Sequence, residues 1–379
     1  PVMAGGVYHN ILIQNNGWAV AFGDDSCGQC DVPRLPTGVV YIGAAAGHSH
    51  TVLIQSDGHA IAFGGNRAGQ CDIPKLPEGA AYVSAAAGHS HTVLVRSDGR
   101  CVACGLNGNG QCQVPDPPEG VAYVKAAAGR NHTVLIRADG VAVAAGCNGS
   151  GRCVVPACPE GVIYVDAAAG RSHTVLVRSD GGAVAFGYNA SGQCDVPELP
   201  GDVGYVGAAV GDTHSILIRS DGLAAAFGSN CHDQCNVPTL DEGVAYVGAI
   251  AGGNQTVLIR SDGDALAFGN NHYRQCAVPD LPQHLMYVTH LFCPDIVLTI
   301  RAEHLGPEDM RVSCHSMGAV EIATFNVDSK KASVGVARRI VADLLHVRLG
   351  SLKLVLPSGV LLLDGAALLR NTLPAGQPT

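Results

Sequence analysis

Short apolar runs separated by polar turns repeat along most of the chain. Between Tyr82 and Ala122 the runs are YVSAAAG, HTVLVR and CVACG, with Ser-Asp-Gly after the second and a proline-rich segment at the end. Apolar runs of this length, bounded by glycine and turn residues, predict buried β-strands. Ser-Asp-Gly predicts a hairpin, because Asp and Gly tolerate the positive φ of a tight turn. Since proline is excluded from central strands, the proline-rich segment predicts the connection to the next copy.

The pattern has a period of 41 residues. The same spacing carries cysteines from Cys30 to Cys276 and tyrosines from Tyr41 to Tyr287, without an insertion or deletion. The turn glycines that mark the seven copies are Gly17, Gly58, Gly99, Gly140, Gly181, Gly222 and Gly263. Seven copies of three or four short strands predict an all-β fold, a seven-bladed β-propeller.

The ends of the repetitive region predict how the ring closes. The chain opens inside a repeat, at Ala4-Gly5-Gly6, and Tyr287 to Arg301 matches the opening part of an eighth copy. We expect these C-terminal strands to complete the blade that the N-terminus begins, so that no edge is left unpaired. An open solenoid would instead need polar capping repeats, and none is visible in the sequence.

The repeated residues resemble those of a known family. AAAGHSHTVLVRSDG, followed by Phe-Gly or an equivalent and then N-x-x-G-Q, is similar to the repeat of the regulator of chromosome condensation family, from about Ala4 to His304. That family's usual repeat is longer and carries Leu at the periodic Cys. The compact repeat is closer to the propeller-type β-lactamase inhibitor proteins. The resemblance implies that residues 1–304 form one propeller of this type.

The last part of the chain has a different pattern. Residues 310–315 and 319–325 alternate as two strands, 334–345 have the apolar spacing of an amphipathic helix, and 352–356 predict another strand before a weak last one. This order resembles a ubiquitin-like β-grasp domain at residues 308–373. Because the chain ends without a diglycine, the resemblance implies a docking module and not a conjugated tag.

Charge and composition disfavour several classes of partner. The formal net charge is −9 with 23 Lys and Arg, and no basic run is present, so nucleic acid is not an expected partner. No apolar stretch is long enough for membrane insertion, and the N-terminus lacks a signal-peptide pattern. The chain has 15 cysteines, which is an odd number, and it is large enough to have its own hydrophobic core. We therefore expect reduced thiols and an intracellular, cytoplasmic protein.

The periodic histidines and cysteines allow a structural and a chemical interpretation. Six histidines share one repeat position, where a metal ring is conceivable, but hydrogen bonding to backbone is the favoured hypothesis because buried polar groups are nearly always paired. They are His9, His50, His91, His132, His173 and His214, with Gln255 at the seventh position. For the periodic cysteines we expect core packing. The pair Cys27 and Cys30 lacks further ligands, and Cys101 and Cys104 face opposite sides of a predicted strand, so we expect no metal.

No catalytic constellation stands out from the repetition. The glycine-rich runs GGNRAG and GLNGNG lack the Lys-Ser/Thr and the helix of a phosphate-binding loop, so they predict turns and no cofactor. We therefore expect a non-catalytic, monomeric ring that serves as a protein-binding scaffold. The family resemblance leaves two other functions open, a docking or regulatory component of a ubiquitin ligase system and nucleotide exchange on a small GTPase. The second is disfavoured, because repeats of constant length leave no protruding loop.

Strand parity predicts which face binds. In an antiparallel blade the G-x-x-H turns and the N-x-x-G-Q loops emerge on one face, and the Ser-Asp-Gly hairpins on the other. The hairpins hardly vary, whereas the loops do: the glycine of repeats one to five becomes Asp233 in repeat six and Arg274 in repeat seven. Drift in unconstrained loops would also produce such variation.

Tyr and Arg are residue types enriched in binding hot spots, which favours docking of a partner protein near blades six and seven. The predicted partner-binding residues are His232, Asp233, His272, Tyr273 and Arg274 in the loops, and Arg130, Arg171 and Asp212 in the turns.

Overall fold

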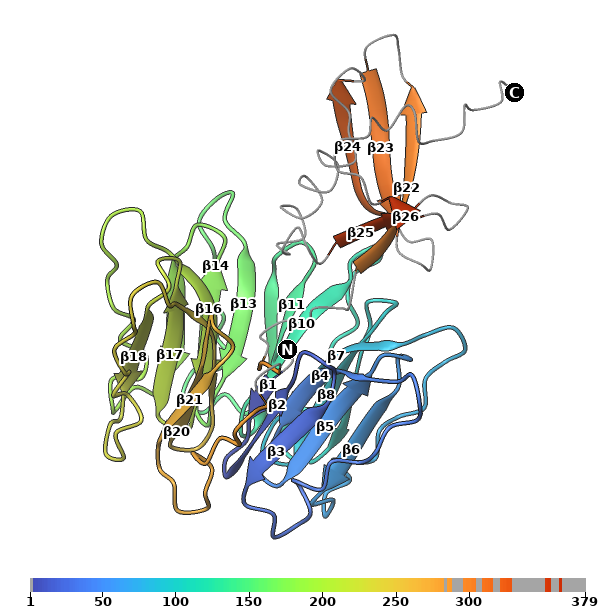
Figure 1. The fold of residues 1–379 in the computed structure, drawn as a ribbon. Helices are drawn as coiled ribbons and strands as arrows, with labels where there is room; N and C mark the ends of the chain where they lie inside the picture. The colour runs from blue at the N-terminus through green and yellow to red at the C-terminus, as the bar shows by residue number, and fades with distance from the viewer. Residues whose placement is uncertain are drawn as a thin grey trace. The chain divides into compact units, whose positions relative to one another are not determined.

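The computed structural model describes residues 3–282, 285–287, 296–304, 309–315, 321–328, 352–355 and 361–362. The chain divides into two units, Pro1–Leu291 and Phe292–Thr379. The first contains seven three-stranded antiparallel sheets, each one repeat long (Figure 1). Blade one is the sheet of β1 to β3, and blade seven is the sheet of β19 to β21. The prediction of an all-β propeller with seven blades is confirmed for this unit, with three strands per blade.

The blades share one order of strands. The inner strands are β1 (Met3–Gly5), β4 (Tyr41–Ala46), β7 (Tyr82–Ala87), β10 (Tyr123–Ala128), β13 (Tyr164–Ala169), β16 (Tyr205–Val210) and β19 (Tyr246–Ala251). The middle strands are β2 (His9–Ile13), β5 (His50–Gln55), β8 (His91–Arg96), β11 (His132–Arg137), β14 (His173–Arg178), β17 (His214–Arg219) and β20 (Gln255–Arg260). The outer strands are β3 (Ala19–Gly23), β6 (Ala60–Gly64), β9 (Cys101–Gly105), β12 (Ala142–Gly146), β15 (Ala183–Gly187), β18 (Ala224–Gly228) and β21 (Ala265–Gly269).

The hydrophobic core lies between neighbouring blades. In β8, Val93 and Val95 pack toward blade four, while Leu94 between them packs toward blade two. Successive side chains of a strand point to opposite faces, so a strand packed on both faces has no place for a polar residue. This explains the continuous apolar run Val93-Leu94-Val95 within HTVLVR, between the hydrogen-bonded Thr92 and the less buried Arg96.

The tyrosine that opens each inner strand holds the proline-rich connection in place. Tyr82 is buried and its hydroxyl donates to Pro74 O over 2.6 Å. The register then shifts between Tyr82 and Ser84, so Val83 lies in a bulge with 54% of its surface exposed. A bulge leaves its extra residue outside the ladder.

The ring closes through both ends of the repetitive region. Contacts run from each inner strand to the next and from β19 back to β1. Tyr287 bridges to Gln14, and Asn15 N donates to Met286 O over 3.0 Å. Closure by C-terminal residues, predicted from the sequence, is thus confirmed for Met286 and Tyr287.

The prediction that the segment up to Arg301 also joins blade one is wrong. Residues 296–301 correspond in the repeat to the middle strand, and in blade one that position is already occupied by β2. The segment instead belongs to β22 (Ile296–His304), which pairs with β23 (Asp309–His315) and runs parallel to β25 (Leu352–Val355).

The second unit contains one five-stranded sheet in the order β24-β23-β22-β25-β26, where β24 is Glu321–Asp328 and β26 is Leu361–Leu362. Of the strands predicted at residues 310–315, 319–325 and 352–356, the described parts, 310–315, 321–325 and 352–355, are strands. The helix predicted at 334–345 lies outside the described residues, so the β-grasp resemblance stays a prediction. No helix able to span a membrane occurs in the described segments.

Candidate binding face around the channel mouth

The G-x-x-H turns and the N-x-x-G-Q loops lie on one side of the propeller, which we call the loop face; the Ser-Asp-Gly turns form the hairpin face. Backbone bonds join the two loop-face segments: Gly65 N, at the start of a loop, donates to Ser49 O in the turn over 2.7 Å. Each loop also reaches the next blade, because the Thr51 hydroxyl of blade two donates to Gln29 O of blade one over 2.7 Å. Strand parity thus correctly predicted that the G-x-x-H turns and the N-x-x-G-Q loops share one face.

The periodic histidines bind adjacent blades together. His50 Nε2 lies 3.0 Å from Thr92 Oγ1 of the next blade, and that hydroxyl donates its proton to Gln70 O over 2.7 Å. The imidazole is therefore the donor, because a hydroxyl has only one proton. The predicted partner was backbone; the observed partner is a hydroxyl. The remaining pairs are His9–Thr51, His91–Thr133, His132–Thr174, His173–Ser215 and His214–Thr256.

Burial keeps these imidazoles neutral. It lowers the pKa of His50 to about 3 and that of His9 to about 4, because a buried cation loses its hydration. The junction between blades seven and one differs: Gln255 Nε2 donates to Gly6 O over 2.8 Å, and Asn10 stands where the other blades have Thr or Ser. No group of residues suited to a metal occurs in the described part of the chain.

The periodic cysteines are loop residues and not core residues. Cys71 is half-buried; its thiol donates to Gly65 O over 3.5 Å, and its amide donates to Asn66 Oδ1 over 2.8 Å. Burial raises the pKa of Cys71 to about 11, so the thiol stays protonated. The expectation of core packing is wrong, because the side chain turns back onto its own loop. These two hydrogen bonds fold the loop back on itself.

Two loops of the loop face carry backbone strain. Asp233 and Arg274 have φ of 62°, whereas five repeats have glycine there, with positive φ throughout. A side chain in this conformation costs free energy, and such outliers concentrate at functional sites. Asn236 Nδ2 donates to Asp233 Oδ1 over 2.8 Å, which offsets part of that cost. Arg274 has no side-chain hydrogen bond within the described residues.

A row of aromatic rings leads from the loop of blade seven to the centre of the face. The ring centroids of Tyr273 and Tyr8 are 5.0 Å apart, those of Tyr8 and His48 5.1 Å, and those of His48 and His89 4.1 Å. His272 packs edge-on against Tyr273. Tyr273 is 42% exposed, so the row begins at a surface side chain and ends among the turns near the axis.

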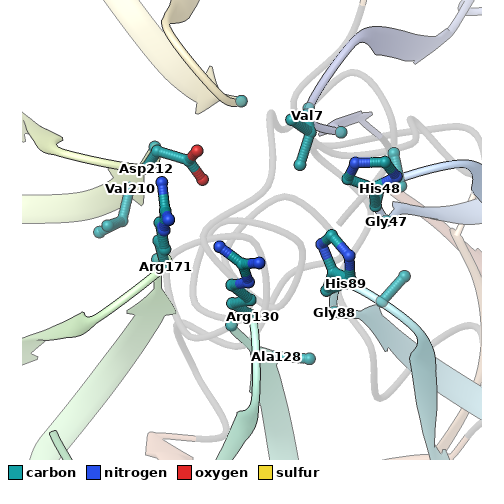
Figure 2. A pocket seen from close by; sticks show the side chains of 18 of the residues that line it. Val7, Gly47, His48, Gly88, His89, Ala128, Arg130, Arg171, Val210 and Asp212 are labelled. Carbon is teal, nitrogen blue, oxygen red and sulfur yellow. The ribbon is translucent and has the colours of Figure 1, made fainter. Parts of the chain in front are cut away.

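The turns surround a cavity of about 200 Å³, which we call the mouth. Figure 2 shows His48, His89, Arg130, Arg171 and Asp212 arranged around it. The glycine before each turn allows this close approach: a Cβ at Gly88 would lie 2.3 Å from Gly129 O of the next blade. Backbone bonds between adjacent turns, such as Arg130 N to Gly170 O at 3.1 Å, fix where each side chain starts.

The structure places three of the predicted binding residues at the mouth and the others in the loops of blades six and seven. Arg130, Arg171 and Asp212 line the mouth, and Tyr273 reaches it through Tyr8. The loop of His232 and Asp233 lies against blade seven, where the Thr256 hydroxyl donates to Gln234 O over 2.8 Å.

Sequence reasoning missed three mouth residues: Tyr8, His48 and His89. A signal was available, because His48 and His89 occupy the same repeat position as Arg130, and Tyr8 follows that position in blade one.

Comparisons with known proteins place the fold. The family model described as the regulator of chromosome condensation (RCC1) repeat matches residues 82–111 and 164–193. Prp20p of Saccharomyces cerevisiae has 17% sequence identity and a TM-score of 0.58, covering 79% of this chain and 90% of its own. Human WBSCR16 has 16% identity and a TM-score of 0.57, covering 68% and 85%. The search of curated proteins gave no match.

These findings define the class: a β-propeller of which residues 82–111 and 164–193 match the regulator of chromosome condensation repeat. Yeast RCC1 (Prp20) in its complex with Kap60 has 19% identity and a TM-score of 0.55, covering 69% of this chain and 77% of its own. Likeness at this level of identity establishes the fold alone.

Proposed function

We propose that this chain is a non-catalytic scaffold that docks a partner protein on its loop face, with Tyr273 and Arg274 as anchors. The observation that carries the proposal is the aromatic row from exposed Tyr273 through Tyr8 to the mouth. Aromatic and Arg side chains next to a preformed concavity are typical of the few residues that dominate binding energy.

The strain at Arg274 supports the same surface. Five repeats keep glycine at this position, so the fold does not require a side chain there. A residue that costs stability and adds an exposed cation beside Tyr273 is expected where binding repays the cost.

The chemistry of the face favours binding over catalysis. The His50-type imidazoles have pKa values near 3 to 4 and are engaged between blades, so they are poor general bases at neutral pH. The periodic thiols are held protonated, as for Cys71. Yeast Prp20, which has this fold, has protein partners: one crystal structure shows it bound to Kap60, and it binds Gsp1p and histones.

Capture by the full-length chain tests the proposal. Native protein and the double variant Y273A/R274A are immobilised, and the proteins retained from an extract of the native source are quantified. We expect a specific set of proteins to be retained by native protein and lost from the variant, without a change in melting temperature.

The matched control is W18A/R100A, which removes an exposed aromatic residue and an exposed arginine from the hairpin face; Trp18 is 70% exposed. It should retain the full set. Asp98 and Asp180 are less suitable controls, because their carboxylates pair with Arg96 and Arg178 within the turns. Loss of binding in W18A/R100A with retention in Y273A/R274A would place the partner on the other face. Stimulated nucleotide release from a captured GTPase would favour the exchange function instead.

A further inference from the structure

Positive charge at the mouth is not neutralised within the described residues. Arg130 and Arg171 line the cavity, and neither guanidinium forms an ion pair with any described carboxylate within 4.0 Å. Only one carboxylate, that of Asp212, lines the same cavity. In Figure 2 the two guanidinium groups and the Asp212 carboxylate lie along one side of the mouth.

A third guanidinium lies against the backbone of the Arg171 turn. Arg152 stands where the other six repeats have Gln, and only 8% of its surface is exposed. Its Nη1 donates to Arg171 O over 3.0 Å, its Nε has no hydrogen-bond partner, and no described carboxylate pairs with it. A buried cation without a counter-charge is costly, so an anion near it would be stabilising.

Arg130 and Arg171 also act on the pKa values of neighbouring groups, although burial is the largest cause of each shift. Burial, followed by the charges of His48, Arg130 and Arg171, lowers the pKa of His89 to about 4. Burial raises the pKa of Asp212 even though Arg171 and Arg130 act in the opposite direction. At the opposite end of the inner strands, Lys125 pairs with Asp166, so the charges there are balanced. The excess of positive charge belongs to the loop-face mouth, in a chain whose net charge is −9.

We propose that the mouth binds a carboxylate side chain of an acidic segment of the partner protein, held by Arg130 and Arg171. The cavity of about 200 Å³ is smaller than the roughly 300–1,000 Å³ of small-molecule sites, so it fits a side chain better than a nucleotide or cofactor. Two adjacent guanidinium groups suit the two oxygens of a carboxylate. The aromatic row to Tyr273 extends the site outward, along a path that a peptide backbone can follow.

This inference rests on the proposed function, because the acidic segment belongs to the docked partner. Its test uses a defined probe, N-acetyl-hexaglutamate amide, titrated calorimetrically into the full-length chain at low salt, where charge interactions are least screened. We expect the R130A/R171A variant to bind the probe at least about tenfold more weakly, since charge-assisted hydrogen bonds are the stronger ones. The control R67A/R100A removes two exposed arginines outside the mouth and should bind like native protein.

A third variant has the opposite sign. D212N removes the carboxylate that competes inside the cavity and keeps the side-chain size, so it should bind the probe more tightly than native protein. Because D212N is nearly isosteric, this arm does not depend on the folding of the double variant.

Absence of probe binding to native protein, or equal losses in R130A/R171A and R67A/R100A, would overturn the inference. Binding of inorganic phosphate to the mouth without binding of hexaglutamate would show that the occupant is a phosphate and not an acidic side chain. Neither result affects the capture experiment at Tyr273 and Arg274, so the inference and the proposed function can fail separately.

Discussion

At the scale of single residues, the loop face departs from the repeat pattern at Asp233 and Arg274, where the backbone is strained. Arg274 has positive φ without a compensating side-chain hydrogen bond in the described structure, whereas Asp233 has one from Asn236. Five other repeats show that glycine satisfies the fold at this position. The side chain of Arg274 is therefore expected to lower the stability of the fold.

The substitution R274G should stabilise the protein by about 1 kcal/mol, because glycine adopts positive φ without the steric penalty of a Cβ, less its greater flexibility in the unfolded chain. D233G should gain less, since it loses the bond from Asn236. Urea denaturation measures both. A destabilised R274G would show that Arg274 has a structural role, and the strain argument for the binding site would fail.

At the scale of elements, six histidines each form a hydrogen bond with a Thr or Ser hydroxyl of the next blade, and we call these contacts histidine latches. They make the ring sensitive to acid. In the folded protein their pKa values lie near 3 to 4, for example about 4 for His91 and about 3 for His132. In the unfolded chain a histidine has its ordinary value near 6.5. Between these values the unfolded chain binds more protons than the folded one, so stability falls as pH decreases.

We expect the free energy of unfolding to be near its maximum around pH 7 and to fall steeply below 6.5, by up to about 1.4 kcal/mol per pH unit for each latch histidine. Urea midpoints between pH 8 and pH 4 measure this. In H132Q, which installs the residue found at position 255, the fall should be shallower by one proton. A profile that is flat from pH 7 to 5 would contradict the buried, neutral latches.

At the scale of the whole molecule, closure of the ring depends on a short seam. Tyr287 is buried against blades one and seven, its hydroxyl donates to Pro279 O over 2.7 Å, and its backbone bridges to Gln14. Met286 O accepts from Asn15 N over 3.0 Å. Met286 and Tyr287 therefore add to the other contacts between blades seven and one, among them the bond from Gln255 Nε2 to Gly6 O and the packing of Leu12 with Val257 in one apolar cluster.

Ending the chain at residue 285 should therefore cost several kcal/mol more than ending it at residue 291, since loss of a buried aromatic side chain alone costs about 3 to 5 kcal/mol. Thermal denaturation of the two truncated chains measures the difference. Equal melting temperatures would refute closure through Tyr287.

The sequence predicted the blades, their turns and the two faces, because a strict period repeats the same local signal in every copy. It did not predict the partner of the latch histidines, since the Thr hydroxyl belongs to the next blade, 42 positions away. The sequence also did not predict that Ile296–Arg301 pairs outside blade one. The segment has the repeat pattern, but β2 already occupies the corresponding position in blade one. The sequence predicted three of the residues at the mouth, Arg130, Arg171 and Asp212, but not Tyr8, His48 and His89. Variation among the turns is visible in the sequence, whereas their convergence on the axis of the ring is not.

We propose that a partner protein docks on the loop face through Tyr273 and Arg274. Once the captured partner is purified, its dissociation constant for the native chain, for Y273A/R274A and for W18A/R100A is the most direct measurement. We predict a weakening of roughly tenfold or more for Y273A/R274A, as expected for loss of a hot spot, and no change for W18A/R100A. Equal affinities of native protein and Y273A/R274A would contradict the account.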